Sequence, residues 1–60
     1  MNDLKDRLIK YHEVEGVSYK QIARELGISL NIMYNYTGDV RDLKPHIKLA
    51  LDKYLTEKGY

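Results

Sequence analysis

Apolar side chains recur along the chain at intervals of three and four residues, which is the spacing of one face of an α-helix. No stretch alternates regularly between apolar and polar residues, and no Asn-Gly or Asp-Gly pair marks a hairpin turn. The pattern therefore predicts an all-α fold. We expect one compact domain over residues 1–60, with four helices at about residues 2–14, 19–26, 30–37 and 44–58.

Serine, glycine and proline residues mark the expected helix ends. Ser18 precedes the second helix and is followed three residues later by Gln21, which is the spacing of a capping box. Ser29 precedes the third helix as a candidate N-cap, and Pro45 fits the first turn of the fourth. Three glycines stand where helices should end: Gly16, Gly27 and Gly38. The helix boundaries thus rest on local signals as well as on periodicity.

The apolar stripes of these helices predict the core. We expect one face of each helix to be buried, with Val14 at the edge of the first stripe and Val40 reaching the core from the loop before the fourth helix. The expected core residues are Leu4, Leu8, Tyr11, Ile22, Ala23, Leu26, Ile32, Met33, Tyr36, Leu43, Ile47, Ala50, Leu51 and Tyr54. Such a core is small, because a chain of 60 residues buries only about 60 % of the surface of its unfolded form.

Positive and negative charges are nearly balanced: ten Lys and Arg stand against nine Asp and Glu, a formal net charge of +1. This is well short of the excess that is typical of a strongly basic nucleic-acid-binding protein. Several opposite charges are spaced i,i+4 and would pair on exposed helix faces: Asp3–Arg7, Asp6–Lys10, Lys48–Asp52 and Lys53–Glu57. The cations left over lie in the middle of the chain: Lys20, Arg24, Arg41 and Lys44.

The composition also narrows the class of protein. There is no cysteine, no apolar run approaches the roughly 18 residues that span a bilayer, and the opening segment MNDLKDRLIK is too charged for a signal peptide. His12 and Glu15 share a helix face but have no second cluster to complete a metal site. Ser18 and Ser29 lack the base that a nucleophile needs. We therefore expect a soluble cytoplasmic protein that is not an enzyme and has no cofactor, metal, membrane contact or small-molecule effector.

The segment IARELGIS, residues 22–29, meets the demands of two helices that cross steeply over a short turn. Close approach of the helices needs a small residue, which Ala23 supplies, and the turn needs a residue that tolerates positive φ, which Gly27 supplies. Apolar residues flank both, and Met33 and Tyr36 give the next helix an inward-facing pair. This is the pattern of a helix-turn-helix.

Residues 18–38 resemble the helix-turn-helix of the Cro/repressor-like (Xre-type) family of bacterial and phage transcriptional regulators. The following segment, to about residue 58, is similar to the part of that family in which a helix beginning with Pro closes the core. The chain departs from the family in having four expected helices where five are common, and in carrying Tyr19 where a phosphate-binding Gln is common. The resemblance implies a sequence-specific regulator that binds double-stranded DNA.

The resemblance and the residues together assign the DNA contacts. The third helix would enter the major groove and present an uncharged outer face: Leu30, Asn31, Tyr34 and Asn35. Asn pairs with the N6/N7 edge of adenine, and Leu30 and Tyr34 suit thymine methyl groups, so we expect an A·T-leaning site. Phosphate contacts are expected from the start of the second helix and from the leftover cations: Ser18, Tyr19, Lys20, Arg24, Arg41 and Lys44.

So few cations per chain favour a homodimer on two half-sites. Its candidate contacts are Leu49, opposite the buried stripe of the fourth helix, and Leu55 at the margin of that stripe. Two other interpretations stay open. The face of Leu30 and Tyr34 would also suit a protein partner, as in a phage-type inhibitor or adaptor. The chain would otherwise be the DNA-binding headpiece of a longer protein, against which the initiating Met1 and the completed fourth helix argue.

Overall fold

The computed structural model describes residues 3–60, which form four α-helices and no strand. The helices are α1 (Leu4–Glu15), α2 (Tyr19–Leu26), α3 (Leu30–Thr37) and α4 (Pro45–Glu57). The predicted all-α, four-helix fold is thereby confirmed. The bounds of α2 and α3 agree with the prediction, α1 extends one residue further, and α4 is one residue shorter at each end. The predicted start of the first helix, at residue 2, lies outside the described residues.

Side-chain caps explain where three of the helices begin. The hydroxyl of Ser18 accepts a hydrogen bond from the backbone N–H of Gln21 at 3.2 Å, and Ser29 caps α3 in the same way. Asp3, which the sequence pattern does not single out, caps α1 by accepting from the backbone N–H of Asp6 at 2.8 Å. Each cap satisfies an N–H group that has no partner within its helix, which contributes about 1 kcal/mol to stability.

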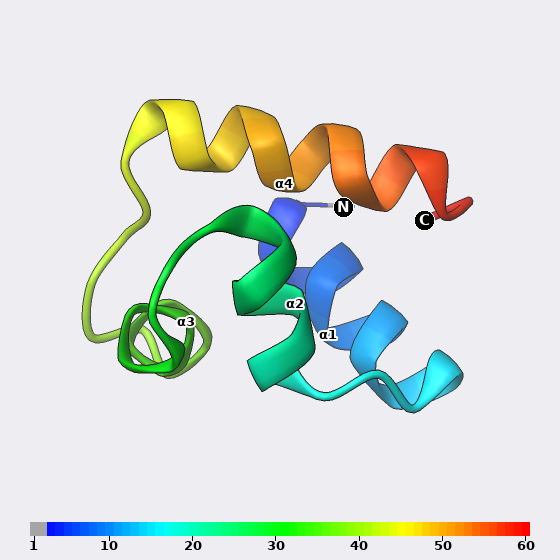
Figure 1. The fold of residues 1–60 in the computed structure, drawn as a ribbon, viewed down its shortest axis with the longest axis horizontal. Coiled ribbons are helices and arrows are strands. Elements are labelled where there is room, and N and C mark those ends of the chain that lie inside the picture. The colour runs from blue at the N-terminus through cyan, green and yellow to red at the C-terminus, as the bar shows by residue number, and fades with distance from the viewer. Residues whose placement is uncertain (1–2) are drawn as a thin grey trace.

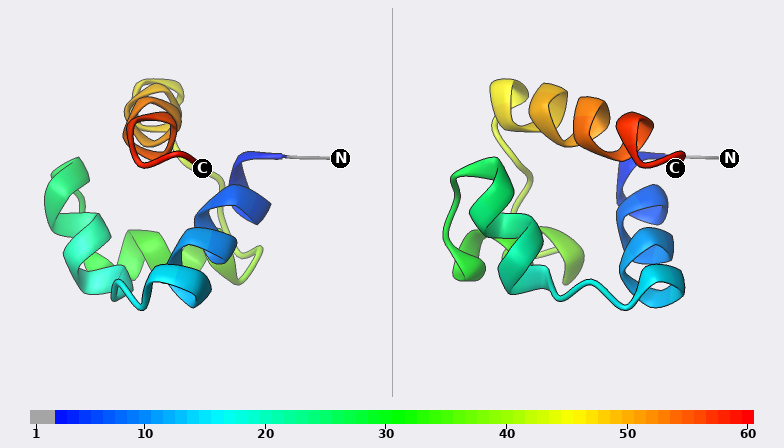
Figure 2. Two further views of the ribbon diagram at one scale, coloured as in Figure 1. Left: turned by 90° about the vertical axis from the view of Figure 1, so that its right-hand side faces the viewer. Right: turned by 45° about the vertical axis from the view of Figure 1, so that its right-hand side comes forward.

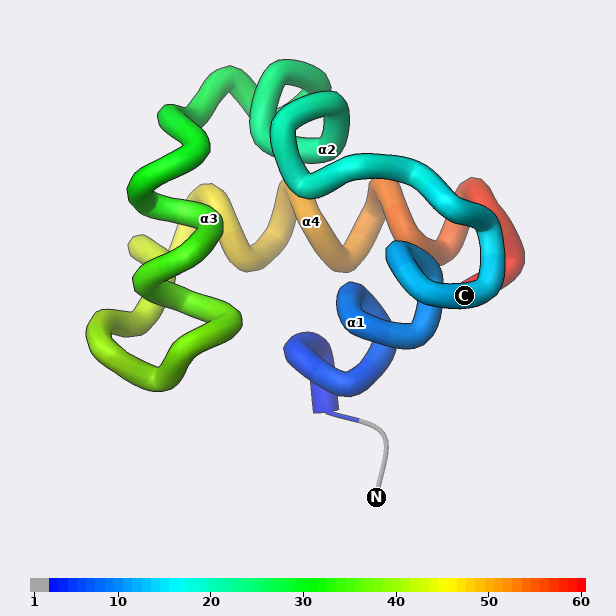
Figure 3. The backbone as a smooth tube through the Cα atoms, turned by 90° about the horizontal axis from the view of Figure 1, so that it is seen from below, coloured from blue at the N-terminus to red at the C-terminus, as the bar shows by residue number. Residues whose placement is uncertain are grey.

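Three of the helices form a curved layer that the fourth helix covers. In Figure 1, α4 runs along the top of the molecule and the other three helices lie below it. Figure 2 (left) shows that α2, α3 and α1 form the curved layer and that α4 covers its concave side. Seen from below in Figure 3, α2 is viewed end-on and α3 along its length, so these two helices cross steeply. The most extensive helix–helix contacts are those of α2 with α3 and of α1 with α4.

The core is a single cluster to which every helix contributes. Its members are at most 6 % exposed: Leu8, Tyr11, Ile22, Ala23, Met33, Tyr36, Leu43, Leu51 and Leu55. Half-buried apolar residues form its rim: Leu4, Val17, Tyr19, Leu26, Ile28, Ile47, Tyr54 and Tyr60. Among residues 3–60 no polar or charged side chain is buried. Burial of apolar surface, worth about 25 cal/mol per Å², is therefore the main source of stability.

Five residue positions differ from the sequence-based expectation. Val14 on α1, expected at the edge of a buried stripe, is 62 % exposed. Ile32 is 40 % exposed and Val40 is 70 % exposed, and Ala50 is exposed as well. Leu55, expected only at the margin of the stripe on α4, is completely buried. Successive helix positions are turned by about 100°, so a small rotation of a helix decides which of two neighbouring apolar residues faces inward. The contacts of α3 and α4 with the other helices favour Met33 over its neighbour Ile32 and Leu51 over its neighbour Ala50.

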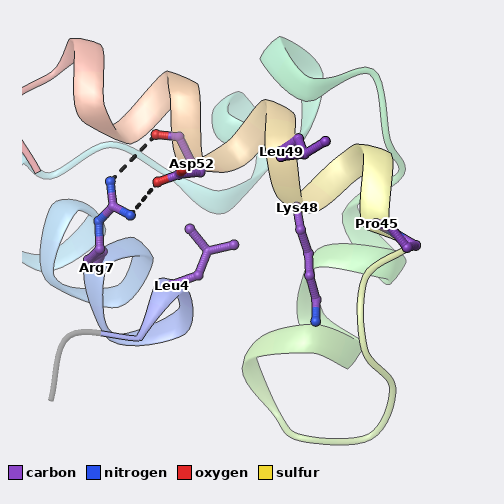
Figure 4. A pocket seen from close by; sticks show the side chains of 6 residues that line it. All are labelled: Leu4, Arg7, Pro45, Lys48, Leu49 and Asp52. Carbon is purple, nitrogen blue, oxygen red and sulfur yellow. Dashed lines mark hydrogen bonds and ion pairs between the residues drawn. The ribbon is translucent and has the colours of Figure 1, made fainter.

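The ion pairs within residues 3–60 join different segments of the chain: Lys5–Asp39, Arg7–Asp52 and Lys48–Asp42. None of the four i,i+4 pairs expected from the sequence is among them. Arg7 ties α1 to α4, since its guanidinium pairs with Asp52 (Figure 4) and also donates to the hydroxyl of Thr56 at 3.0 Å. The guanidinium also donates to the carbonyl oxygen of Tyr60 at 2.8 Å. Two cations that the sequence assigns to local pairs are thus used elsewhere: Arg7 joins α1 to α4, and Lys48 joins α4 to the preceding loop.

Candidate nucleic-acid interface

Helices α2 and α3 are joined by a tight turn over residues 27–29. Gly27 adopts the left-handed conformation with φ 72°, and its N–H donates to the carbonyl oxygen of Arg24 at 3.2 Å. The N–H of Ile28 donates to the carbonyl oxygen of Ala23 at 3.0 Å. These two bonds form a Schellman motif, which ends α2 and redirects the chain into α3. With Ala23 only 2 % exposed beneath the crossing, the unit has the helix-turn-helix geometry that its sequence predicts.

The outer face of α3 is uncharged and rich in hydrogen-bonding groups. Asn31 and Tyr34 are exposed, the latter by 54 %, while Leu30 and Asn35 are half-buried. Asn31 and Asn35 are spaced i,i+4, so their amides lie one above the other on the same side of the helix. Each amide can donate and accept hydrogen bonds. All four residues predicted as base contacts are thus accessible from one side of α3.

Ile32 extends this face, although its hydrophobicity and spacing predict a core position. Met33 is completely buried, so the residues on either side of it in the sequence, Ile32 and Tyr34, project toward opposite flanks of α3. Ile32 is spaced i,i+3 from Asn35 and is therefore its neighbour on the helix surface. The sequence contained one usable signal, because Met33 and Tyr36 already form an i,i+3 pair that fills the inward side. Sequence reasoning counted all three as buried and missed Ile32.

Tyr19, predicted as a phosphate contact, is half-buried between two other rings. It stacks on His12 with 3.9 Å between ring centroids, and it meets Tyr34 edge-on at 6.1 Å. His12 Nδ1 lies 2.6 Å from the carbonyl oxygen of Val17, which holds the imidazole against the start of α2. Burial, assisted by the nearby carboxylate of Glu13, raises the pKa of Tyr19, so the phenol is neutral at neutral pH. The ring of Tyr19 thus packs against Tyr34 and links it to His12.

The start of α2 is the second predicted anion-binding feature. Ser18 is exposed, and its hydroxyl is occupied by the capping bond from Gln21. The backbone N–H groups of Tyr19 and Lys20 precede the first intrahelical hydrogen bonds, so the helix leaves them without an internal partner. Unpaired N–H groups together with the helix dipole favour a phosphate at such a position. The hydroxyl of Ser18 is thus used to cap α2, and the groups left to bind a phosphate here are the backbone N–H groups of Tyr19 and Lys20.

The cations predicted to contact phosphate come from the elements before and after α3: Lys20, Arg24, Arg41 and Lys44. All four side chains are exposed, and none has an ion-pair partner within residues 3–60. The first two lie one turn apart on α2, where like charges repel by about 0.2–0.5 kcal/mol. An anion bound between them would relieve this repulsion. The structure therefore leaves these four cations available, whereas Lys5, Arg7 and Lys48 are used in tertiary pairs. Lys10, Lys53 and Lys58 also have no ion-pair partner in this part of the chain, so it is the position of the four beside α3 that distinguishes them.

A hollow of about 190 Å³ joins the exposed flank of α3 to the segment before α4. Its lining consists of Ile32, Asn35, Arg41, Asp42, Leu43, Lys44 and Ile47. The chain reverses here at Asp39, which has φ 60°, and the N–H groups of Val40 and Arg41 donate to the carbonyl oxygen of Asn35 at 2.8 and 3.1 Å. This turn carries Val40 away from the core and brings two of the cations beside the outer face of α3.

Leu49, predicted as a dimer contact, is 72 % exposed on α4. It borders an open groove of about 630 Å³ between α1 and α4, whose lining is shown in Figure 4: Leu4, Arg7, Pro45, Lys48, Leu49 and Asp52. Leu55 is completely buried and has no surface to offer to a second copy of the chain. The predicted dimer surface is thereby reduced to Leu49 and its groove.

Two further features bear on the class of protein. Residues 3–60 contain no group of three or more His, Cys, Asp or Glu side chains arranged to hold a metal ion. Within the same part of the chain, every helix is too short or too polar to cross a lipid bilayer. The chain matches no protein-family model, no curated protein and no solved structure. The fold and the chemistry of its surface are therefore what points to a function.

Proposed function

We propose that the chain is a sequence-specific double-stranded-DNA-binding protein that regulates transcription in the cytoplasm, like the Cro/repressor-like regulators of bacteria and phages. One observation carries this proposal: an uncharged, hydrogen-bonding helix face follows a helix-turn-helix turn and is bordered by four exposed cations that lack ion-pair partners within residues 3–60. In the proposed complex α3 lies in the major groove and α2 crosses the backbone.

Base reading is assigned to the outer face of α3. Asn31 and Asn35 each suit the N6 donor and N7 acceptor of adenine, and a good bidentate pair contributes about 1–3 kcal/mol of discrimination. Leu30 and the ring of Tyr34 offer apolar contacts for thymine methyl groups. An A·T-leaning site follows from this set of side chains, because none of them carries the charge that favours guanine O6 and N7 or cytosine N4.

Phosphate binding is assigned to the elements around α3. Lys20 and Arg24 would hold the backbone that α2 crosses, assisted by the N–H groups exposed next to Ser18. Arg41 and Lys44 would hold a second stretch of backbone beyond the end of α3. Because these contacts are few, one chain alone would bind weakly, and a homodimer on half-sites about 34–36 Å apart would strengthen binding. Leu49 on α4 is the proposed contact between copies.

A salt titration tests the proposal. Binding of the chain to A·T-rich and G·C-rich duplexes is measured by fluorescence anisotropy between about 50 and 200 mM salt. We expect tighter binding to the A·T-rich duplexes and a fall of log K with log salt concentration. Each of Lys20→Ala, Arg24→Ala, Arg41→Ala and Lys44→Ala should reduce the slope by about 0.9, the contribution of one phosphate contact.

Matched variants separate specific contacts from general charge effects. Lys53→Ala removes an exposed cation from α4 and should leave the slope unchanged. Asn31→Ala should reduce the preference for A·T-rich duplexes while keeping the slope. Absence of duplex binding at the lowest salt concentration would overturn the proposal, as would a Lys53→Ala variant that behaves like Lys20→Ala.

A second candidate function is a protein-interaction module, such as a phage-type inhibitor or adaptor. The exposed apolar surface of α3 favours it, because Ile32 and Tyr34 are 40 % and 54 % exposed and the net charge is only +1. Aromatic and apolar side chains of this kind are enriched at protein interfaces. Under this function, Tyr34→Ala and Ile32→Ala would abolish binding of a protein partner, and duplex DNA would bind neither tightly nor with sequence preference.

A further inference from the structure

The feature that the proposed function leaves unexplained is the apolar flank of α3 formed by Ile32. Its side chain is 40 % exposed and borders the hollow of about 190 Å³ between α3 and the segment before α4. Leu43 and Ile47 also line this hollow. Its charged lining residues are the cations Arg41 and Lys44 and the carboxylate of Asp42, which is paired with Lys48 at 2.6 Å. An apolar side chain thus lines the same hollow as a hydrogen-bonding amide, that of Asn35, and two positively charged side chains.

The surroundings of Ile32 suit contact with the 5-methyl group of thymine on the edge of a base pair. In the major groove adenine, guanine and cytosine present hydrogen-bond donors and acceptors, whereas thymine also presents its 5-methyl group. A branched alkyl side chain gains by covering that methyl group, but it leaves a cytosine N4 donor or a guanine acceptor without a partner. Ile32 at this position would therefore favour thymine and disfavour the other bases.

Resting on the proposed function, we infer that Ile32 is a specificity-determining residue that contacts the methyl group of a thymine. Because Ile32 and Asn35 are i,i+3 neighbours, the thymine lies within one base step of the adenine that Asn35 reads. The phosphate held by Arg41 and Lys44 lies on the same flank of α3 and holds the helix in register there.

The other apolar residues of the face are placed differently. Tyr34 projects toward the opposite flank, where its ring meets Tyr19 edge-on at 6.1 Å. Leu30 is half-buried in the first turn of α3. Of the apolar side chains on α3, Ile32 is the one that lines the hollow together with the cations of the following segment. A thymine contact by Ile32 would thus be additional to those assigned to Leu30 and Tyr34.

Replacement of thymine by deoxyuridine tests the inference, because it removes only the methyl group. A pool of duplexes with a randomised central segment first yields the preferred site of the unchanged chain. Each thymine of that site is then replaced in turn by deoxyuridine, and Kd is measured by fluorescence anisotropy. At each thymine whose methyl group is contacted, we expect the replacement to weaken binding of the unchanged chain about three- to tenfold, as for the loss of one buried methyl group. Ile32→Ala should weaken binding to the thymine duplex by a similar factor and should be insensitive to the replacement at one of these positions, while it keeps the sensitivity at any thymine read by Leu30 or Tyr34.

Val40→Ala provides the matched control, since Val40 is a 70 % exposed apolar residue in the neighbouring turn. It should keep the full sensitivity to deoxyuridine. Circular dichroism melting curves check that Ile32→Ala is folded, and Ile32→Val, which keeps a branched alkyl group, should retain most of the effect. An Ile32→Ala variant as sensitive as the unchanged chain at every thymine overturns the inference alone. Failure of the pool to yield any bound duplex at low salt overturns the proposed function and the inference with it.

Discussion

The imidazole ring of His12 lies nearly parallel to the ring of Tyr19, with 3.9 Å between their centroids and 16° between their planes. Tyr34 forms an edge-on contact with Tyr19, with 6.1 Å between the two ring centroids. His12 belongs to α1, Tyr19 begins α2, and Tyr34 lies on the outer face of α3. A row of aromatic side chains therefore links three helices and ends at a residue proposed to contact DNA.

Loss of the middle ring of this row should destabilise the domain. We expect Tyr19→Ala to lower the free energy of unfolding by about 1–3 kcal/mol, because the substitution removes one stacked and one edge-on contact. Urea denaturation followed by far-ultraviolet circular dichroism measures the change. Tyr19→Phe keeps the ring and should be as stable as the unchanged chain; equal losses in the two variants would contradict a role for the ring. If Tyr19→Phe weakens duplex binding at unchanged stability, the hydroxyl contacts phosphate.

Alanine substitutions at the two leucines predicted as dimer contacts should have very different effects on the stability of the domain. Leu55 is completely buried, so Leu55→Ala should cost about 2–5 kcal/mol and leave so small a domain largely unfolded. Leu49→Ala should change stability by less than about 0.5 kcal/mol, because Leu49 is 72 % exposed. Urea denaturation measures both. A stable Leu55→Ala variant would show that the buried stripe of α4 is placed wrongly.

A second substitution at Leu49 tests the proposed dimer. Sedimentation equilibrium over a range of concentrations should show association of the unchanged chain and a weaker association of Leu49→Asp, which places a charge in the groove between α1 and α4. A chain that is monomeric at every concentration, alone and on a two-half-site duplex, contradicts the dimer while leaving the DNA-binding proposal intact.

The turn between α2 and α3 should depend on glycine at one position. Gly27 has φ 72°, and a Cβ atom there would meet no heavy atom within 4 Å. The cost of Gly27→Ala is therefore a matter of backbone conformation alone and should be about 1–2 kcal/mol. Gly27→Asn should cost less, since Asn tolerates the left-handed conformation. Thermal unfolding that ranks the unchanged chain, the Asn variant and the Ala variant in any other order would contradict this assignment.

Stability should fall in alkaline solution because tyrosines are packed in the core. Burial raises the pKa of Tyr36, and burial together with the hydrogen bond to the Tyr11 hydroxyl raises the pKa of Tyr54. Unfolded phenols lose their protons near about pH 10, whereas the folded ones hold them to higher pH. The contribution of these two tyrosines to stability is therefore constant below about pH 10 and decreases above it.

Melting curves between about pH 8 and pH 11, with tyrosinate absorbance recorded in parallel, measure this dependence. Lys5, whose pKa is raised chiefly by its hydrogen bond to Asp39, acts in the same direction. Tyr54→Phe keeps the Lys5–Asp39 pair, so its decrease above about pH 10 should be shallower than that of the unchanged chain. Identical profiles for the two proteins would show that Tyr54 does not contribute.

Much of the fold follows from short-range patterns in the sequence. The bounds of α2 and α3 are predicted to the residue because Ser18 and Ser29 accept hydrogen bonds from N–H groups three residues later, and because Gly27 allows the left-handed turn. The predicted base-contact residues also lie together, since one helix carries them all. These are interactions within one or two turns of the chain, so the sequence contains everything that decides them.

The rotation of α3 and α4 about their own axes was decided by contacts between helices. Ile32 and Ala50 fit the apolar stripes as well as their neighbours do, yet both face solvent, and Leu55 is buried instead. The same holds for charges: Arg7 has an acidic residue at i−4, and it pairs with Asp52 on another helix. Local spacing offers several nearly equal partners, and the choice between them depends on residues far away in the sequence.

The sequence by itself therefore determined the helices, their ends and the chemistry of the outer face of α3, because capping bonds, the left-handed glycine and the helical period act within a few residues. Only the tertiary structure decided that Ile32 joins that face, that Tyr19 supports Tyr34, and that Arg41 lies beside Asn35. These contacts depend on how the four helices pack against one another to bury apolar surface. They therefore form only when all four helices are in place.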